Sequence, residues 1–227
     1  MLSTPPRDGH NTKSDQLLAK QMFMLFPTPM FMGRLPDLSI CERIEQKLQE
    51  LKKAGKGTFT PEGTVPAFMS QDDLHKLPEM QELVNVIMHE SSQILDAYAI
   101  KRDSHYITNM WGNIANPNRR HHLHIHPNCV LSGLVYIKTP PQCGPTMFCS
   151  PRQFAQLLEP QYIRKNELNA DTFVMPAEKG RMLLWPSYVP HGVDQGAADE
   201  SQDRIVVAFN VMIRGAVERH TMRLEFH

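Results

Sequence analysis

The sequence predicts a mainly β protein with helices at its N-terminal end (α+β), in which a helical layer packs on a β-sandwich or barrel. Two observations support this prediction. Residues of about 38–54 and 78–98 carry apolar side chains every three or four positions, which is the helical period. From about 104 to 214 the chain consists of short runs rich in Val, Ile and aromatic residues, separated by Gly and Pro. Helices followed by many short strands favour a helical layer on one sheet.

The two helices carry their own start and stop signals. Ser39 and Glu42 have the spacing of a capping box, and Gly55 is suited to end the first helix. Pro78 is suited to the first turn of the second helix. The apolar stripe of the first helix is Ile40, Ile44, Leu48 and Leu51, and that of the second is Leu83, Val86, Ile87, Ile94 and Leu95.

The remaining segments divide the chain into a tail and one domain. Residues 1–20 are expected to be a disordered or loosely attached tail, and 21–227 a single domain with its β core at about 104–214. Two prolines interrupt the apolar run 22–32, which predicts an edge strand. The core strands are expected at 105–111, 130–137, 146–149, 181–185 and 204–213, a loop at 58–66, and a partly helical insertion at about 152–170.

Composition excludes several classes of function. The 24 basic residues equal the 24 acidic ones, so the formal net charge is zero and a nucleic-acid binder is not expected. No apolar run approaches the roughly 20 residues that span a bilayer, so no membrane role is expected. The four cysteines form no Cys-x-x-Cys pair and the polar N-terminal segment does not resemble a signal peptide, which together indicate reduced thiols in a cytoplasmic protein.

Histidines gather in one short run. His121, His122, His124 and His126 fall within six positions, and His191 follows far downstream. Alternate residues of an extended strand share a face, so two of these rings with His191 could surround one metal ion and leave its other side open. The pairs 122/124 and 124/126 both have this spacing. The alternative is a solvated run of histidines without a function.

Arg204 begins an apolar strand rich in Val, Ile and Phe. A guanidinium that points into an apolar barrel is costly unless an anion meets it, and a carboxylate fits its two-pronged shape. The alternative is a strand-end charge in water that pairs with a nearby carboxylate. The candidates for that pairing are Asp199, Glu200 and Asp203.

Several elements, in order, resemble a known family. They are Leu25-Phe-Pro-Thr-Pro, Ser70 to Leu77, Asn109-Met-Trp111, His124-Ile-His126-Pro, Ser132-Gly-Leu-Val-Tyr136, Ser150-Pro-Arg152, Leu184 to Val193 with His191, and Arg204 to Asn210. Over about residues 23–213 the chain resembles the iron(II)- and 2-oxoglutarate-dependent oxygenases. It is most similar to a group of bacterial and phage oxygenases of unassigned substrate.

This resemblance implies a double-stranded β-helix, or jelly roll, with the helical layer packed on one sheet. It implies that His124, His126 and His191 hold Fe(II), and that Arg204 binds the distal carboxylate of 2-oxoglutarate. Tyr136 and Asn109 are the further residues assigned to this cosubstrate. The wider superfamily has Asp or Glu where this chain has His126, so the site would hold three neutral imidazoles. Its charge would then depend on the bound dianion and on carboxylates that contact the ligands.

The function expected from the resemblance is hydroxylation of a C–H bond, with O2 consumed and succinate and CO2 released. The substrate would be a small molecule or a peptidyl side chain, and Trp111, Asn128 and Arg120 are candidates to line its entrance. A symmetric homodimer is the default expectation for the oligomer. Two alternatives are a three-histidine dioxygenase of cupin type, which needs no cosubstrate, and a non-catalytic metal-binding jelly roll.

Overall fold

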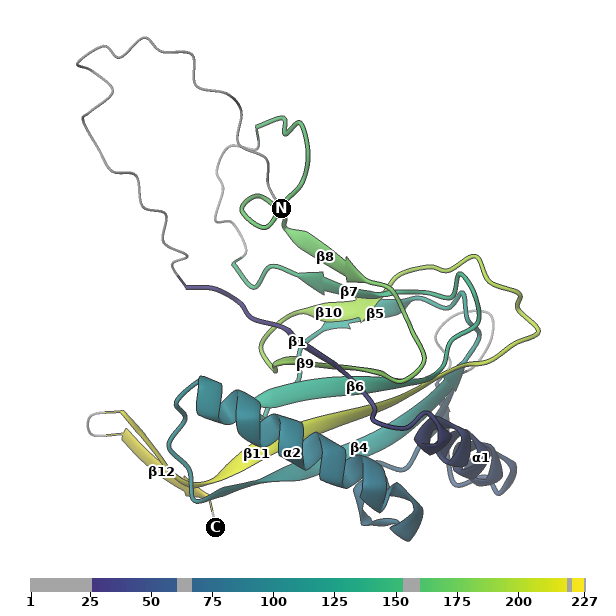
Figure 1. The fold of residues 1–227 in the computed structure, drawn as a ribbon, viewed down its shortest axis with the longest axis horizontal. Coiled ribbons are helices and arrows are strands. Elements are labelled where there is room, and N and C mark those ends of the chain that lie inside the picture. The colour runs from purple at the N-terminus through teal and green to yellow at the C-terminus, as the bar shows by residue number, and fades with distance from the viewer. Residues whose placement is uncertain (1–25, 61–66, 153–159, 220–221, 227) are drawn as a thin grey trace.

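The protein folds into two antiparallel sheets that face each other, with two α-helices on the outer side of the larger sheet (Figure 1). The computed structural model describes residues 26–60, 67–152, 160–219 and 222–226. The mainly β architecture predicted from the sequence is confirmed. The predicted tail 1–20, residues 22–25 of the expected edge strand, 61–66 of the expected loop and 153–159 of the expected insertion lie outside the described residues. The division into a tail and one domain therefore stays a prediction.

The larger sheet has the strand order β1-β9-β6-β11-β4-β3-β2, and a further strand, β12, pairs with β11. These strands are β1 (Phe31–Arg34), β9 (Arg181–Pro186), β6 (Leu131–Lys138), β11 (Arg204–Arg219), β4 (Ser104–Ala115), β3 (Ala67–Ser70), β2 (Gly57–Thr60) and β12 (Met222–Phe226). The smaller sheet has the order β5-β10-β7-β8. Its strands are β5 (His121–His124), β10 (His191–Val193), β7 (Thr146–Cys149) and β8 (Thr172–Met175).

Helix α1 (Ser39–Lys53) begins differently from the expected capping box. Ser39 is its first residue and makes no capping bond from its side chain; instead the backbone N–H of Ser39 donates to Asp37 Oδ1 at 2.8 Å. The expectation for Ser39 and Glu42 was wrong because the acceptor for the first turn comes from Asp37. At the other end Gly55 adopts a positive φ of 66°, and Lys56 N–H donates back to the Leu51 carbonyl at 3.0 Å, which closes the helix.

Helix α2 (Gln81–Ala97) follows two short 3₁₀ turns, Leu74–Lys76 and Pro78–Met80. Pro78 therefore starts a 3₁₀ turn, and the α-helix begins three residues after it. Within the described residues no helix is both long and apolar enough to cross a membrane.

The sequence analysis missed the shortest strands. The predicted loop 58–66 contains most of β2, and β3, β8, β10 and β12 were not expected. Strand β1 lies at one edge of the larger sheet and starts only after the two prolines. Each of these strands has three to five residues. A stretch this short shows little periodicity, and pairing with a neighbouring strand decides its conformation.

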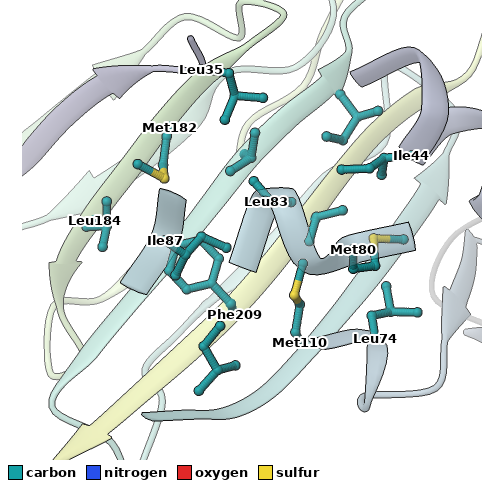
Figure 2. Packing of buried hydrophobic residues seen from close by; sticks show 14 of the residues in the cluster. Leu35, Ile44, Leu74, Met80, Leu83, Ile87, Met110, Met182, Leu184 and Phe209 are labelled. Atoms are coloured by element: carbon teal, nitrogen blue, oxygen red, sulfur yellow. The ribbon is translucent and has the colours of Figure 1, made fainter. Parts of the chain in front are cut away.

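Alternate residues of the central strands supply two separate hydrophobic clusters. One cluster lies between the helices and the larger sheet and includes Leu83 and Ile87 of α2 with Met110 and Phe209 of the sheet (Figure 2). The other lies between the two sheets and comprises Leu134, Tyr136, Phe148, Met175, Leu183, Trp185, Val189 and Val206. Each central strand therefore stabilises the helical layer with one face and lines the space between the sheets with the other.

Candidate metal centre

Strand pairing in the smaller sheet brings the histidines together. His124 is the last residue of β5 and His191 is the first residue of β10, and the two are direct partners in the antiparallel register. His126 follows β5 by two residues, where its backbone N–H donates to the carbonyl of Ser187 at 3.1 Å. Three imidazoles from two distant stretches of chain thus meet at one edge of the space between the sheets.

The three rings each offer a nitrogen to a common point. One ring nitrogen from each of His124, His126 and His191 lies within 4.8 Å of the other two. The Nε2 atoms of His124 and His126 are 3.0 Å apart. Two nitrogens that bind one metal ion at about 2.1 Å and at a right angle to each other are about 3.0 Å apart. The observed spacing fits a pair of metal ligands.

The second nitrogen of each ring is occupied by a hydrogen-bond acceptor. His124 Nδ1–H donates to the carbonyl of His122 at 2.9 Å, and His191 Nδ1–H donates to that of Val189 at 3.0 Å. His126 Nδ1–H donates to the side-chain Oδ1 of Asn210 at 2.6 Å. These acceptors place the proton on Nδ1, so the lone pair of every ring is on Nε2. Lone pairs that face each other repel, and a shared cation removes the repulsion.

Burial favours the neutral, metal-binding form of His126 and His191. It lowers the pKa of His191 to about 3 and also lowers the pKa of His126. A neutral imidazole retains the lone pair that a protonated one lacks, so the site is competent to bind a cation at neutral pH.

The two neighbouring histidines have other roles. The ring of His122 is exposed and is not part of the three-nitrogen group; its backbone carbonyl accepts the bond from His124. The ring of His121 packs edge-on against His124, with centroids 4.6 Å apart. Of the two possible pairs, the geometry therefore groups 124/126 with His191.

Two side chains that the sequence analysis gave no role hold His126 in place. Asn210 Oδ1 accepts from His126 and also from Ser132 Oγ at 2.8 Å, and both residues are buried. The Asn210 amide donates to Asn109 Oδ1 at 2.8 Å. A signal for Asn210 was present, because it lies on β11 at the same alternation as Arg204 and is polar in an apolar strand. Asn109 thus lies behind His126, and its role toward a cosubstrate stays a prediction.

Arg204 lies inside the protein and not at a solvated strand end. It is only 6% exposed, and among the described residues its Nε and Nη2 atoms are buried without a hydrogen-bond partner. The nearby carboxylates bind elsewhere: Asp203 accepts from Gln49 at 2.9 Å, and Asp199 accepts from Ser201. Burial lowers the pKa of the guanidinium. A buried cation with free donors indicates a site for an anion.

Tyr136 lies beside this cation. The guanidinium carbon of Arg204 is 5.5 Å from the centroid of the Tyr136 ring. The Tyr136 hydroxyl and Thr146 Oγ1 are hydrogen-bonded at 2.6 Å, so the phenol is buried with a partner. Its position fits either a residue of the interior or a second contact to the same anion.

The carboxylates expected around the metal ligands are not found there. Within the described ranges, the acceptors of the three Nδ1–H groups are two backbone carbonyls and the amide of Asn210. The expectation was wrong because backbone and amide oxygens already occupy those positions. The residues that would surround a metal ion are therefore neutral.

The three residues expected at a substrate entrance are placed differently from one another. Trp111 packs against His126, with ring centroids 5.8 Å apart. Asn128 is exposed in a left-handed turn with a φ of 62°. Arg120 is exposed, and its Nε lies 3.7 Å from Asp194 Oδ1. The structure thus brings Trp111 to the histidines, while the role of all three toward a substrate stays a prediction.

Comparison with known sequences finds a family model that matches part of the chain. Residues 109–210 match the model of a family described as "Putative 2OG-Fe(II) oxygenase". This segment contains the three histidines, Arg204 and Asn210. A search of curated proteins finds no match to the chain.

Solved structures share the fold at low sequence identity. A prolyl-4-hydroxylase from Pseudomonas putida is 12% identical, with a TM-score of 0.56 over 83% of this chain and 94% of that one. SnoK, a non-heme alpha ketoglutarate dependent carbocyclase from nogalamycin biosynthesis, is 13% identical, with a TM-score of 0.62 over 85% and 83%. HygX from Streptomyces hygroscopicus, solved with nickel, 2-oxoglutarate and hygromycin B, is 14% identical, with a TM-score of 0.55 over 82% and 83%. The predicted double-stranded β-helix is confirmed.

Proposed function

We propose that this protein, whose residues 109–210 match the family model described as "Putative 2OG-Fe(II) oxygenase", is an iron(II)- and 2-oxoglutarate-dependent oxygenase that hydroxylates a C–H bond. One observation carries the proposal. A cluster of three imidazoles and a buried guanidinium whose Nε and Nη2 atoms have no hydrogen-bond partner face the same space between two sheets. The first suits a cation and the second an anion, which is the pair of ligands that such a reaction requires.

In this proposal His124, His126 and His191 hold Fe(II) through Nε2, and Arg204 binds the distal carboxylate of 2-oxoglutarate. Iron with its cosubstrate supplies the oxidation of the C–H bond by O2, with release of succinate and CO2. Arg204 supplies a fixed positive charge, so a dianion binds in one orientation. Tyr136, beside the guanidinium, is suited to donate a second hydrogen bond to that carboxylate.

The apolar side chains of the interior limit access of water. Trp185 lies edge-on against both His191 and Phe148, at centroid distances of 4.7 and 5.0 Å. Trp185 is 2% exposed and Phe148 is 6% exposed. A dry surrounding strengthens the attraction between the dianion, the metal and Arg204.

The substrate class, the location and the oligomer are part of the same proposal. A small molecule or a peptidyl side chain would enter past Trp111, with Asn128 and Arg120 at the rim. All four cysteines are free thiols, which supports a cytoplasmic location. A symmetric homodimer remains the default expectation.

The proposal is tested without knowledge of the substrate. The purified protein is loaded anaerobically with iron(II) and titrated with 2-oxoglutarate, and a weak visible charge-transfer band is expected to appear. Admission of O2 is then expected to yield succinate slowly. A protein that binds iron in full but develops no band, and forms no succinate with any substrate tested, would contradict the proposal and favour a non-catalytic metal-binding protein.

The all-histidine ligand set also suits a cupin-type dioxygenase that binds its substrate directly at the metal, and Arg204 separates the two candidates. In the proposed enzyme, Arg204→Ala weakens binding of 2-oxoglutarate by about 100-fold, because it removes one partner of a buried charge pair. Metal affinity without the cosubstrate is expected to stay unchanged. Equal cosubstrate affinity and turnover in the variant would favour the cupin-type reaction.

A further inference from the structure

We propose that Asn210 is a positioning residue that sets the metal affinity of the centre, and that its neutral amide makes this affinity depend on the bound dianion. The inference rests on the proposed metal site. It concerns how the chain holds His126, and it does not depend on which reaction follows.

The contacts of Asn210 fix the orientation of its amide. Its Oδ1 accepts from His126 Nδ1–H at 2.6 Å and from Ser132 Oγ–H at 2.8 Å. Its Nδ2 donates to Asn109 Oδ1 at 2.8 Å, and Thr108 Oγ1 donates to the same Asn109 oxygen at 3.0 Å. A reversed amide would place a donor against both His126 and Ser132. The network therefore presents an oxygen, and not a nitrogen, to the ligand ring.

This oxygen accepts the Nδ1–H hydrogen bond of His126, as backbone carbonyls do for the other two histidines. His124 and His191 are each held by a carbonyl within two residues of chain, which moves with the ring. His126 lies beyond the end of β5, and its acceptor is 84 positions away on β11. Asn210 thus ties the least supported ligand to the central strand of the larger sheet, and its own 6% exposure keeps water from replacing that bond.

The chemical nature of the acceptor has a second consequence. A carboxylate at this position would supply negative charge next to a ligand, as often occurs around metal-bound histidines. The amide supplies none, and the other two acceptors are neutral as well. A divalent ion in this centre keeps its full charge, and Arg204 adds another positive charge to the same interior. Binding of the metal and of a dianion should therefore be strongly coupled.

The test measures metal affinity directly. Cobalt(II), as a spectroscopic substitute for iron(II), is titrated into the full-length protein with and without 2-oxoglutarate, by calorimetry and by the visible cobalt spectrum. Asn210→Ala is expected to weaken cobalt binding by 10- to 100-fold, the usual loss when the partner of a ligand histidine is removed. Ser132→Ala leaves the bond between Asn210 and His126 in place and is expected to cause a smaller loss.

Asn210→Asp has nearly the same shape, keeps the acceptor toward His126 and Ser132, and provides the decisive comparison. It loses the donor to Asn109 Oδ1, so the Asn109 amide has to turn its NH2 group toward the new carboxylate. The variant is expected to bind cobalt about tenfold more tightly than the unmodified protein when the cosubstrate is absent. Because the new carboxylate already neutralises part of the metal charge, 2-oxoglutarate should strengthen cobalt binding less in this variant. Gln93→Glu on the exposed side of α2 adds the same charge remote from the site and is expected to change neither quantity.

The outcomes separate this inference from the proposed function. Unchanged cobalt affinity in Asn210→Ala overturns the positioning role. The same holds if Asn210→Asp weakens cobalt binding as much as Asn210→Ala does. An equal effect of 2-oxoglutarate in Asn210→Asp and the unmodified protein overturns the charge argument. Absence of metal binding in the unmodified protein overturns both the inference and the proposed function, whereas metal binding with the expected order of variants but no succinate overturns the proposed function alone. If Asn210→Ala does not fold, the cobalt affinity of Asn210→Asp with and without 2-oxoglutarate still tests the inference.

Discussion

The two faces of the larger sheet use the same strands for different purposes. The outer face is covered by α1 and α2 and consists of apolar residues such as Val207 and Phe209, both fully buried. The inner face alternates with it along β11 and carries Arg204 and Asn210 among apolar neighbours. Successive side chains of a strand point to opposite sides. One strand can therefore stabilise the fold with one face and carry the residues of the candidate site on the other.

The two faces also differ in the polar groups that they bury. In the described part of the chain, the inner face buries a charged group with unpartnered donors, Arg204, and the unpartnered Nε1 of Trp185, whereas helix α2 buries the neutral hydroxyl of Ser91 without a partner. The helix-side cluster is formed by hydrophobic residues. Burial of an unpartnered charge lowers stability, and burial of apolar surface raises it. The apolar outer face therefore stabilises the fold, while the inner face retains unpartnered donors that a ligand can bind.

The largest effect is expected for Ile87→Ala on the outer face. Ile87 is fully buried between α2 and the sheet, so the truncation leaves a cavity and should lower the free energy of unfolding by about 2–5 kcal/mol. Urea denaturation measures this loss, and metal titration should show unchanged affinity. The exposed Gln93 of the same helix, replaced by Ala, is the control with little effect. A parallel loss of metal affinity in Ile87→Ala would show that the two faces are coupled.

The opposite sign is expected for Arg204→Met on the inner face. Without a cosubstrate, the variant removes a buried cation that has unpartnered donors, so the free energy of unfolding should rise by about 1–4 kcal/mol. Thermal denaturation with and without 2-oxoglutarate measures the difference. Arg181→Met is the control: Arg181 forms an ion pair with Glu178, so its loss should destabilise. A destabilised Arg204→Met would mean that the guanidinium already has a stabilising partner.

Gly133→Ala tests how closely the outer face is packed at the centre of β6. An added Cβ would lie 2.3 Å from the Phe209 ring and 2.8 Å from the Leu183 carbonyl oxygen, so a loss of about 1–3 kcal/mol in unfolding free energy is expected. Gly33→Ala on the edge strand β1 is the control, since its nearest neighbour would be 3.9 Å away. Chemical denaturation should show a loss only in the first variant; equal stabilities would refute the tight packing.

The smallest effect is expected for Tyr136→Phe. The variant removes the hydrogen bond to Thr146 and leaves that buried hydroxyl without it, which should cost about 0.5–1.5 kcal/mol of unfolding free energy. Affinity for 2-oxoglutarate should also fall if the phenol contacts its carboxylate, and calorimetry measures this. Tyr188 is 55% exposed, so Tyr188→Phe should change neither quantity. Unchanged cosubstrate affinity in Tyr136→Phe would restrict this residue to packing.

The parts of the fold that were predictable carry long periodic signals. Helix α2 and strands β6 and β11 follow the positions expected from their apolar patterns. The helix buries one face, and the two strands are apolar runs of eight or more residues that are buried on both faces. The capping of α1 was not predictable from residue spacing, since Asp37 binds the backbone N–H of Ser39 that Glu42 would accept from in a capping box. Strands such as β10, with three residues, exist only because β5 and β7 lie on either side of it.

The sequence by itself determined which chemical groups could form a site: histidines at alternate positions, a third imidazole downstream and an arginine in an apolar strand. These properties follow from residue type and local spacing. Only the tertiary structure decided that His126, and not His122, meets His191, that Asn210 holds His126, and that Arg204 is buried away from the carboxylates near it in sequence. The reason is physical: such contacts join strands that are far apart in the chain, and their register depends on the packing of the whole sheet.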